Sequence, residues 1–168
     1  MSAGFLNHRI GLDIIGPLFQ TKKGNRFILV IVDYFTKWCE AIPLPNSESL
    51  TVAAALVDHW VARYGSPYII HTDQGTAFEN YLFRALCHLL GIVKTRSSPF
   101  HPAGNGQTER TNKTLMAFLR NMVDQSRADS WDDLLPRCLL AYRATIHSST
   151  SFSPHMMLFG RDLRLPSD

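Results

Sequence analysis

The sequence has 168 residues, of which 45% are hydrophobic and 18% charged, and its formal net charge is +3. This length and composition fit one globular domain and exclude a disordered chain. No apolar run approaches the roughly 20 residues that span a bilayer, no signal-peptide pattern opens the sequence, and the small positive charge permits a nucleic-acid partner without requiring one.

Three antiparallel strands are expected first. Residues 9–15 form an apolar run around Asp13 that stops at Gly16-Pro17, and a turn then leads into the apolar run from Phe27 to Asp33. A continuous apolar run of that length is typical of a strand buried on both faces. A third strand is expected from Trp38 to Leu44.

The middle of the sequence alternates between helix and strand. Apolar residues recur at helical spacing from Ser47 to Arg63, and Gly65-Ser66-Pro67 ends that helix. Residues 68–72 are then predicted to form a strand that ends at Asp73. A second helix is expected from about Phe78 to Leu90, with Gly91 as its C-terminal cap.

The last third of the sequence is expected to be mainly helical. A final strand is predicted at residues 92–95, and the two prolines and two glycines of residues 96–106 predict a mobile loop. Helices are expected at residues 107–126 and 131–145. This order of elements predicts a mixed α/β sheet of five strands flanked by helices.

Three carboxylates are candidate metal ligands. Asp13 lies within an apolar strand, where an unpaired carboxylate is costly to bury, Asp73 ends another strand, and Glu109 lies in the first turns of a helix. Hard oxygen ligands suit Mg²⁺ or Mn²⁺, and two such ions roughly 4 Å apart hold the attacking and leaving oxygens of a phosphoryl displacement. Taken singly, each carboxylate is more typical of a cap or a helix-dipole partner.

The residues around these carboxylates resemble a known family. Glu109 follows Asp73 after 35 intervening residues, as in the D,D-35-E catalytic core of retroviral and retrotransposon integrases, and the sequence is most similar in character to integrases of gypsy-type long-terminal-repeat retrotransposons. The similar blocks are residues 12–18, 33–38, 71–78, 100–110 and 141–150.

The resemblance implies a ribonuclease-H-like fold and one integrase catalytic core domain over residues 1–168, with the core at about 8–147 and a C-terminal extension at about 148–168. It implies a two-metal DNA strand transferase and endonuclease that carries out 3′-end processing of element DNA and strand transfer into target DNA. The same resemblance implies two Mg²⁺ or Mn²⁺ ions, a homodimer or higher multimer, no membrane partner, and a nuclear location with a cytoplasmic phase.

The sequence departs from many relatives in three places. Gly11 stands where many carry a larger residue, Ala77 where many carry Glu, and Ala103 where many carry Gln. The N-terminal zinc domain and the basic C-terminal domain of complete integrases are not visible in these 168 residues. We therefore expect this core to perform the disintegration reaction but to integrate poorly.

Five residues near the acidic triad are expected to contact DNA, and the resemblance places two of these positions, Asn112 and Lys113, beside the active site and the DNA end. An ion pair with Glu109, four residues earlier on the helix, is the alternative role for Lys113. A solvated helix face is an equal alternative for Arg120. The five residues are Asn105, Gln107, Asn112, Lys113 and Arg120.

The remaining ring side chains favour structural roles. His101 is expected to be a turn residue whose ring is hydrogen-bonded, and His71 is expected to pack or to form a hydrogen bond. The tryptophans, Trp38, Trp60 and Trp131, are expected in the core or in an interface.

Two other functions are open to this sequence. A ribonuclease-H-like nuclease that cuts RNA–DNA hybrids uses similar carboxylates, although the spacing favours an integrase, and a hybrid-cleavage assay would separate the two. A domesticated element could survive as a DNA-binding or dimerisation module. The intact triad argues against such a module, and loss of strand transfer with added Mn²⁺ would support it.

Overall fold

We describe a computed structural model of the chain at residues 3–98, 100, 106–123 and 125–166. Its centre is one sheet in the order β3-β2-β1-β4-β5. Strands β1 to β3 pair antiparallel, whereas β4 pairs parallel with both β1 and β5. The strands are β1 (Arg9–Ile15), β2 (Phe27–Asp33), β3 (Cys39–Leu44), β4 (Ile69–Thr72) and β5 (Val93–Arg96).

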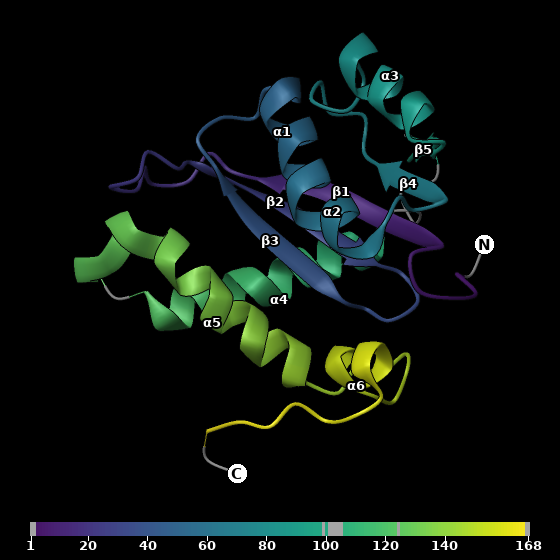
Figure 1. Cartoon of the computed structure of the whole chain (residues 1–168). Coiled ribbons are helices and arrows are strands. Elements are labelled where there is room, and N and C mark those ends of the chain that lie inside the picture. The colour runs from purple at the N-terminus through teal and green to yellow at the C-terminus, as the bar shows by residue number, and fades with distance from the viewer. Residues whose placement is uncertain (1–2, 99, 101–105, 124, 167–168) are drawn as a thin grey trace.

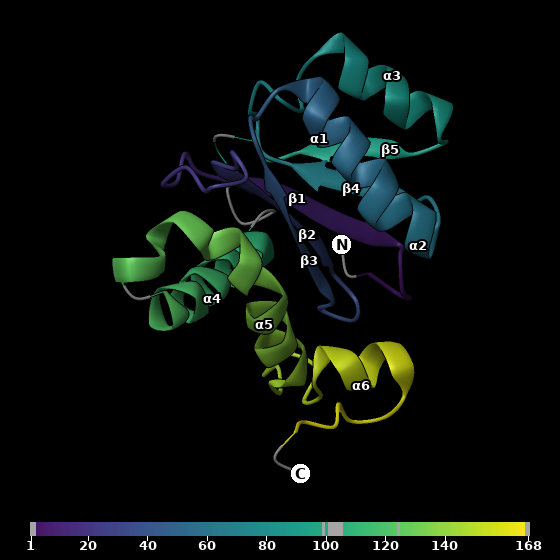
Figure 2. The same ribbon diagram turned by 60° about the vertical axis from the view of Figure 1, so that its left-hand side comes forward.

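Helices cover both faces of this sheet (Figure 1). Helices α1 and α3 lie over one face, and α4 and α5 lie over the other, as the turned view also shows (Figure 2). The helical elements are α1 (Ser49–Leu56), a π-helical turn (Val57–Val61), α2 (Ala62–Tyr64), α3 (Tyr81–Leu89), α4 (Gly106–Met122), a 3₁₀ turn (Gln125–Ser130), α5 (Trp131–Ala144) and α6 (Pro154–Phe159). In the described part of the chain, no helix has both the length and the apolar character of a membrane span.

The alternation of side chains along the strands builds two cores. Leu29 and Ile31 of β2 pack under α1 and α3, whereas Val30 and Val32 pack under α4 and α5. Strand β2 is therefore buried on both faces, as its continuous apolar run predicts. In β1, Leu12 faces the first core, so Asp13 points to the opposite face, which α4 covers.

The predicted strands and the first long helices are confirmed, with shifts at their ends. The helix predicted at residues 47–63 contains the π-helical turn, and the second helix begins at Tyr81 because the Asn80 side chain accepts a hydrogen bond from the Phe83 amide and caps it. Gly91 has a φ of 68°, which suits its predicted place after that helix.

Two helical predictions near the C-terminus are corrected. The helix expected at residues 107–126 ends at Met122, and a 3₁₀ turn precedes α5. Helix α6 was not predicted, although its signals are present. Ser153 caps it by accepting from the Met156 amide, Pro154 occupies its first turn, and Gly160 ends it in the left-handed conformation.

Candidate active site

Strand pairing brings two of the three candidate carboxylates together. Because β1 and β4 are parallel with Gly11 opposite His71, the same register extended by two residues sets Asp13 beside Asp73. Both residues line one pocket of about 230 Å³. The carboxyl ends of parallel strands thus form the acidic edge of the sheet.

Backbone amides fix how these two carboxylates point. The amide of Ile14 donates to Asp13 Oδ1 at 2.9 Å, and the amide of Gly75 donates to Asp73 Oδ1 at 2.8 Å. A Cβ at Gly75 would lie 2.9 Å from that same oxygen, closer than ordinary contact. A side chain at position 75 would therefore displace the Asp73 carboxylate from this orientation.

Helix α4 reaches the acidic edge because one of its faces is buried against the sheet. Thr108, Thr111, Leu115 and Leu119 are its buried residues. A Cβ at Gly11 would lie 2.3 Å from the Thr108 hydroxyl oxygen and would also collide with the Tyr34 ring. The larger residue of many relatives thus has no room at Gly11, since Thr108 and Tyr34 occupy that space.

Glu109 follows Thr108 on α4 and is exposed. The pKa of Asp13 responds to the other two carboxylates. Burial raises this pKa to about 6, the charges of Asp73 and Glu109 raise it as well, and the hydrogen bonds from the Ile14 amide and from Asn112 oppose the rise. A carboxylate with like charges nearby and no cation resists ionisation. Folding therefore brings the three acids within electrostatic range.

Asn112, one turn after Glu109, contacts the site directly. Its Nδ2 donates to Asp13 Oδ2 at 2.5 Å. Its Oδ1 is buried and has no hydrogen-bond partner among the described residues. In the structure this side chain orients Asp13, and its contact with DNA stays a prediction.

The oxygens gathered here suit a divalent cation. Carboxylates and a free amide oxygen are the hard ligands that Mg²⁺ and Mn²⁺ prefer. Within the described residues, no group of three or more His, Cys, Asp or Glu side chains is already arranged to hold a metal ion, and none of the three acids forms a salt bridge there. The residue types fit a metal, and the uncompensated charge at Asp13 favours one.

The other residues expected to contact DNA are dispersed. Lys113 and Arg120 are exposed on α4, and no ion pair joins Lys113 to Glu109 in the described part of the chain. Gln107 is half-buried, and its Oε1 accepts from Lys37 Nζ at 2.9 Å. Asn105 lies outside the described residues, as do His101 and Ala103. The mobility expected for their loop stays a prediction.

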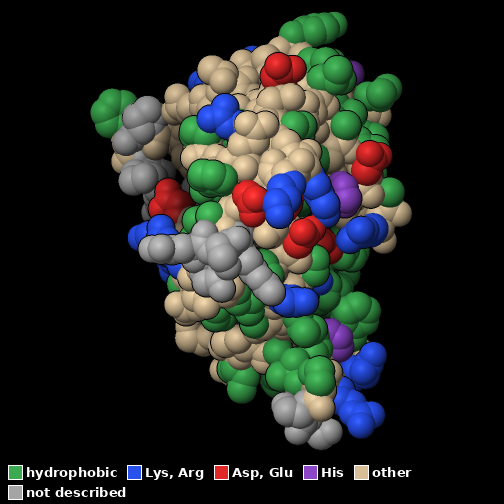
Figure 3. Space-filling model, turned by 90° about the vertical axis from the view of Figure 1, so that its left-hand side faces the viewer, with side chains coloured by type: hydrophobic (Ala, Val, Ile, Leu, Met, Phe, Trp, Pro, Cys, Tyr) green, Lys and Arg blue, Asp and Glu red, His purple; other side chains and the backbone are tan. Residues whose placement is uncertain are grey.

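One face of the molecule gives no simple guide to where DNA would bind. On the side drawn in Figure 3, Lys and Arg side chains lie among Asp and Glu side chains. Mixed signs on one face produce no extended field of one charge. Candidate DNA contacts must therefore be argued from local groups of residues.

The structural roles predicted for the ring side chains are confirmed where the structure describes them. His71 hydrogen-bonds Thr95 Oγ1 at 2.8 Å and Ser97 Oγ at 3.0 Å. All three tryptophans are buried. Burial, together with the charges of Arg9 and Lys94, lowers the pKa of His71 to about 4, so the ring is neutral at pH 7.

Comparison with known proteins identifies a family for this chain. The family model described as integrase core domain matches residues 7–102, more than half of the chain. The chain belongs to the integrase core domain family. The matched range includes Asp13 and Asp73 and ends before Glu109, so the third acid rests on the sequence spacing and on the charge effect at Asp13.

Relatives of this integrase core come from a transposon and from retroviruses. The chain is 30% identical over 158 residues to the retrovirus-related Pol polyprotein from transposon 412 of Drosophila melanogaster, which agrees with the predicted likeness to gypsy-type elements. It is 36% identical over 142 residues to the Gag-Pol polyprotein of Walleye dermal sarcoma virus. These alignments cover 94% and 84% of the chain but only 13% and 8% of the polyproteins.

Solved integrase structures share the fold. The HTLV-2 integrase catalytic core domain in complex with magnesium superposes with a TM-score of 0.72 at 19% identity, covering 92% of this chain and 98% of that one. A chain of the simian T-cell lymphotropic virus intasome in complex with a PP2A regulatory subunit gives a TM-score of 0.77 at 24% identity, covering 99% and 58%. The predicted ribonuclease-H-like fold is confirmed.

Proposed function

We propose that this chain is the catalytic core of an integrase that processes the 3′ ends of element DNA and joins them to target DNA. The proposal rests on the family membership together with one observation. Two carboxylates, Asp73 after β4 and Glu109 on α4, raise the pKa of the partly buried Asp13 of β1, and no salt bridge to Asp13 occurs among the described residues. Clustered uncompensated carboxylates are typical of metal-dependent phosphoryl-transfer sites.

Asp13, Asp73 and Glu109 are the residues that would hold Mg²⁺ or Mn²⁺ ions, two in our proposal. Such ions supply Lewis-acid chemistry, which activates a water or a 3′-hydroxyl and offsets charge on the leaving oxygen. The similar HTLV-2 integrase core is described in complex with magnesium. This metal chemistry suits a reaction in which one phosphodiester oxygen replaces another at phosphorus.

The chain's own residues orient the acids for that reaction. The Ile14 amide and the Asn112 side chain each donate to one oxygen of Asp13, so the plane of its carboxylate is fixed from both sides. The Gly75 amide does the same for one oxygen of Asp73. Fixed acceptors of this kind lower the cost of reorganisation during reaction, because they need no rearrangement when charge develops.

The partners we propose are element DNA ends and target DNA, held by a homodimer or higher multimer. Similar integrase cores are described in dimeric and trimeric forms. Lys113 and Arg120 project from the exposed side of the helix that carries Glu109. Cations beside a phosphoryl-transfer site position the nucleic-acid backbone.

A disintegration assay with added Mn²⁺ tests the proposal on this chain. Asp73→Asn keeps an oxygen that can accept from the Gly75 amide but removes the charge, so we expect it to fold and to lose roughly 100-fold or more of activity. Asp58→Asn, at an exposed position of the π-helical turn, is the matched control and is expected to stay within about twofold of the parent.

Two outcomes would overturn the proposal. One is equal activity of the parent and a folded Asp73→Asn variant. The other is cleavage of RNA–DNA hybrids by the parent without any DNA joining, which would assign the nuclease alternative instead. Circular dichroism of both variants establishes that they are folded before either outcome is interpreted.

A further inference from the structure

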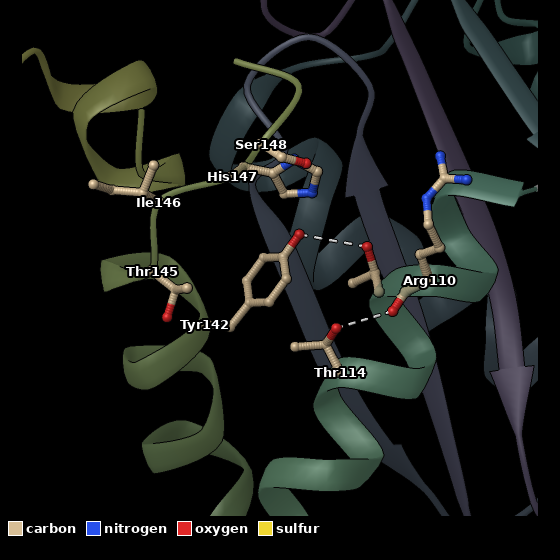
Figure 4. A pocket seen from close by; sticks show the side chains of 8 residues that line it. Arg110, Thr114, Tyr142, Thr145, Ile146, His147 and Ser148 are labelled. Atoms are coloured by element: carbon tan, nitrogen blue, oxygen red, sulfur yellow. Dashed lines mark hydrogen bonds between the residues drawn. The ribbon is translucent and has the colours of Figure 1, made fainter. Parts of the chain in front are cut away.

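A second polar region begins one residue after Glu109, where the start of α4 meets the C-terminal end of α5. A hollow of about 340 Å³ is lined there by Arg110, Thr114, Tyr142, His147 and Ser148 among others. Figure 4 shows Tyr142 between α5 and α4, with His147 and Ser148 near its hydroxyl end. Segments far apart in the sequence thus build one polar wall.

A second hollow of about 420 Å³ adjoins this wall from the β2–β3 turn. Lys37 and Gln107 line it, together with Ser149, the residue after Ser148. The Tyr142 hydroxyl, which lines the first hollow, donates to the backbone oxygen of Lys37 at 3.0 Å. The two hollows share no lining residue, but this hydrogen bond and the consecutive residues Ser148 and Ser149 connect their walls.

The basic groups of this region lie close enough to repel one another. Burial lowers the pKa of Lys37, the Asp33 carboxylate opposes this effect, and the charge of Arg110 lowers the pKa further. Burial lowers the pKa of His147, and the charges of Lys37 and Arg110 add to it. Neither Lys37 nor Arg110 forms a salt bridge among the described residues.

Lys37 is held in place by an unusual backbone conformation. Its φ is 65°, in the left-handed region that favours glycine over a long side chain. Its Nζ donates to the Tyr34 carbonyl at 2.6 Å and to Gln107 Oε1 at 2.9 Å. A lysine fixed at a position better suited to glycine indicates a use for its charge.

Gln107 adds an amide donor that forms no hydrogen bond within the described residues. Its Nε2 is buried and has no hydrogen-bond partner among the described residues, although its Oε1 is bound to Lys37. A buried donor left without a partner destabilises the fold, because it has lost its hydrogen bonds to water. An anion beside Gln107 would accept a hydrogen bond from this Nε2 group.

We propose that Lys37, Gln107 and Arg110 bind one phosphate of the DNA backbone, with the Ser148 hydroxyl as a further donor. This inference rests on the proposed function, since Arg110 is next to Glu109 and a strand that reaches the acids would continue past it. Two cations, an amide and a hydroxyl form a set of donors that matches phosphate oxygens.

The first test is DNA binding by the whole chain in EDTA, which removes catalysis from the measurement. Fluorescence anisotropy with a labelled duplex is recorded over a range of salt concentrations. We expect Arg110→Gln to weaken binding about tenfold and to reduce the slope of log affinity against log salt by about 1. Arg137→Gln, at an exposed position on α5, makes the same change of charge and is expected to leave both quantities unchanged.

Lys37→Gly separates a role in binding from a role in folding. Glycine adopts a φ of 65° readily, so the melting temperature is expected to hold while DNA binding weakens about fivefold or more. Unchanged binding and salt slope in both Lys37→Gly and Arg110→Gln would overturn the inference.

A duplex scanned with single neutral methylphosphonates identifies the contact. At one position, neutralising the phosphate is expected to weaken binding of the parent and to abolish the further loss caused by Arg110→Gln, because the two changes remove the same interaction. If Arg110→Gln weakens binding equally at every position, no single phosphate is bound and the inference fails. Failure of the Asp73→Asn assay alone would reject the proposed catalysis and leave this binding result intact.

Discussion

Glu79 and Asp13 are two carboxylates whose surroundings shift their pKa values in opposite directions. Glu79, before α3, forms salt bridges with Lys94, Arg84 and Arg96. Burial acts to raise the pKa of Glu79, but the hydrogen bonds from Lys94 and Arg84 and the nearby positive charges outweigh it and lower the pKa to about 2. Asp13 has amide donors and acidic neighbours, and its pKa rises to about 6.

The two sites differ in whether basic side chains surround the carboxylate. At Glu79, three basic side chains from α3 and β5 tie the edge of the sheet to its covering helix. At Asp13, the chain fixes the carboxylate with neutral donors and leaves its charge uncompensated. We infer that Glu79 stabilises the fold and that Asp13 is kept for a cation from solution.

The largest expected effect is on catalysis. Glu109→Gln is expected to lower disintegration activity roughly 100-fold or more, because it removes one of three acids that would hold the metal. Glu79→Gln removes the same charge elsewhere and is expected to keep the activity of the folded enzyme within about twofold. The disintegration rates of both variants, normalised to folded protein, check this prediction. Equal losses of activity would contradict different roles for the two acids.

The next largest effect is on stability, and here Glu79→Gln is the variant that is affected. Glu79→Gln is expected to lower the free energy of unfolding by about 2 kcal/mol, since it leaves three cations without their shared partner. Urea unfolding at pH 7 measures the change. A loss no larger than that of the Asp58→Asn control would show that the salt bridges contribute little.

The contribution of Glu79 should also follow pH. Its pKa is about 2 in the folded protein and 4.5 in the reference state, so ionised Glu79 favours folding fully above about pH 4.5, and this contribution is lost as the pH falls toward 2. The difference in unfolding free energy between the parent and Glu79→Gln should therefore shrink below about pH 4.5. A constant difference from pH 6 to 3 would contradict the assignment.

The smallest expected effect is an increase in stability. Above pH 6 the ionised Asp13 is disfavoured in the folded state because its pKa is raised by burial and by Asp73 and Glu109. Asp13→Asn is thus expected to increase the free energy of unfolding by about 1 kcal/mol at pH 8 in EDTA. Thermal unfolding in the absence of divalent cations measures it. A destabilised variant would mean that the charge of Asp13 stabilises the fold, contrary to this prediction.

Much of the fold was accessible from the sequence because its signals are local. Apolar periodicity and the turn residues around Gly65 and Gly91 located the strands and helices of both layers. Helix α6 was missed even though Ser153, Pro154 and Gly160 are ordinary start and stop signals. The π-helical turn that splits the first long helix has no comparable local signal in the sequence.

The sequence could predict that the three acids come together, but it could not predict the residues that hold them in place. Spacing and neighbouring residues selected Asp13, Asp73 and Glu109, but they could not show that Asn112 binds Asp13 or that Thr108 and Tyr34 fill the space at Gly11. Those contacts join residues far apart in the sequence. They depend on how α4 docks onto β1, which no local pattern encodes.

The central claim is that the uncompensated charge around Asp13 serves a divalent cation, and a thermal unfolding titration with Mn²⁺ tests it most directly. At a concentration 100 times the dissociation constant, one bound ion should stabilise the parent by about 2.7 kcal/mol. The account predicts the same stabilisation for Glu79→Gln and none for Asp73→Asn. Equal stabilisation of the parent and Asp73→Asn, or none in the parent, would contradict it.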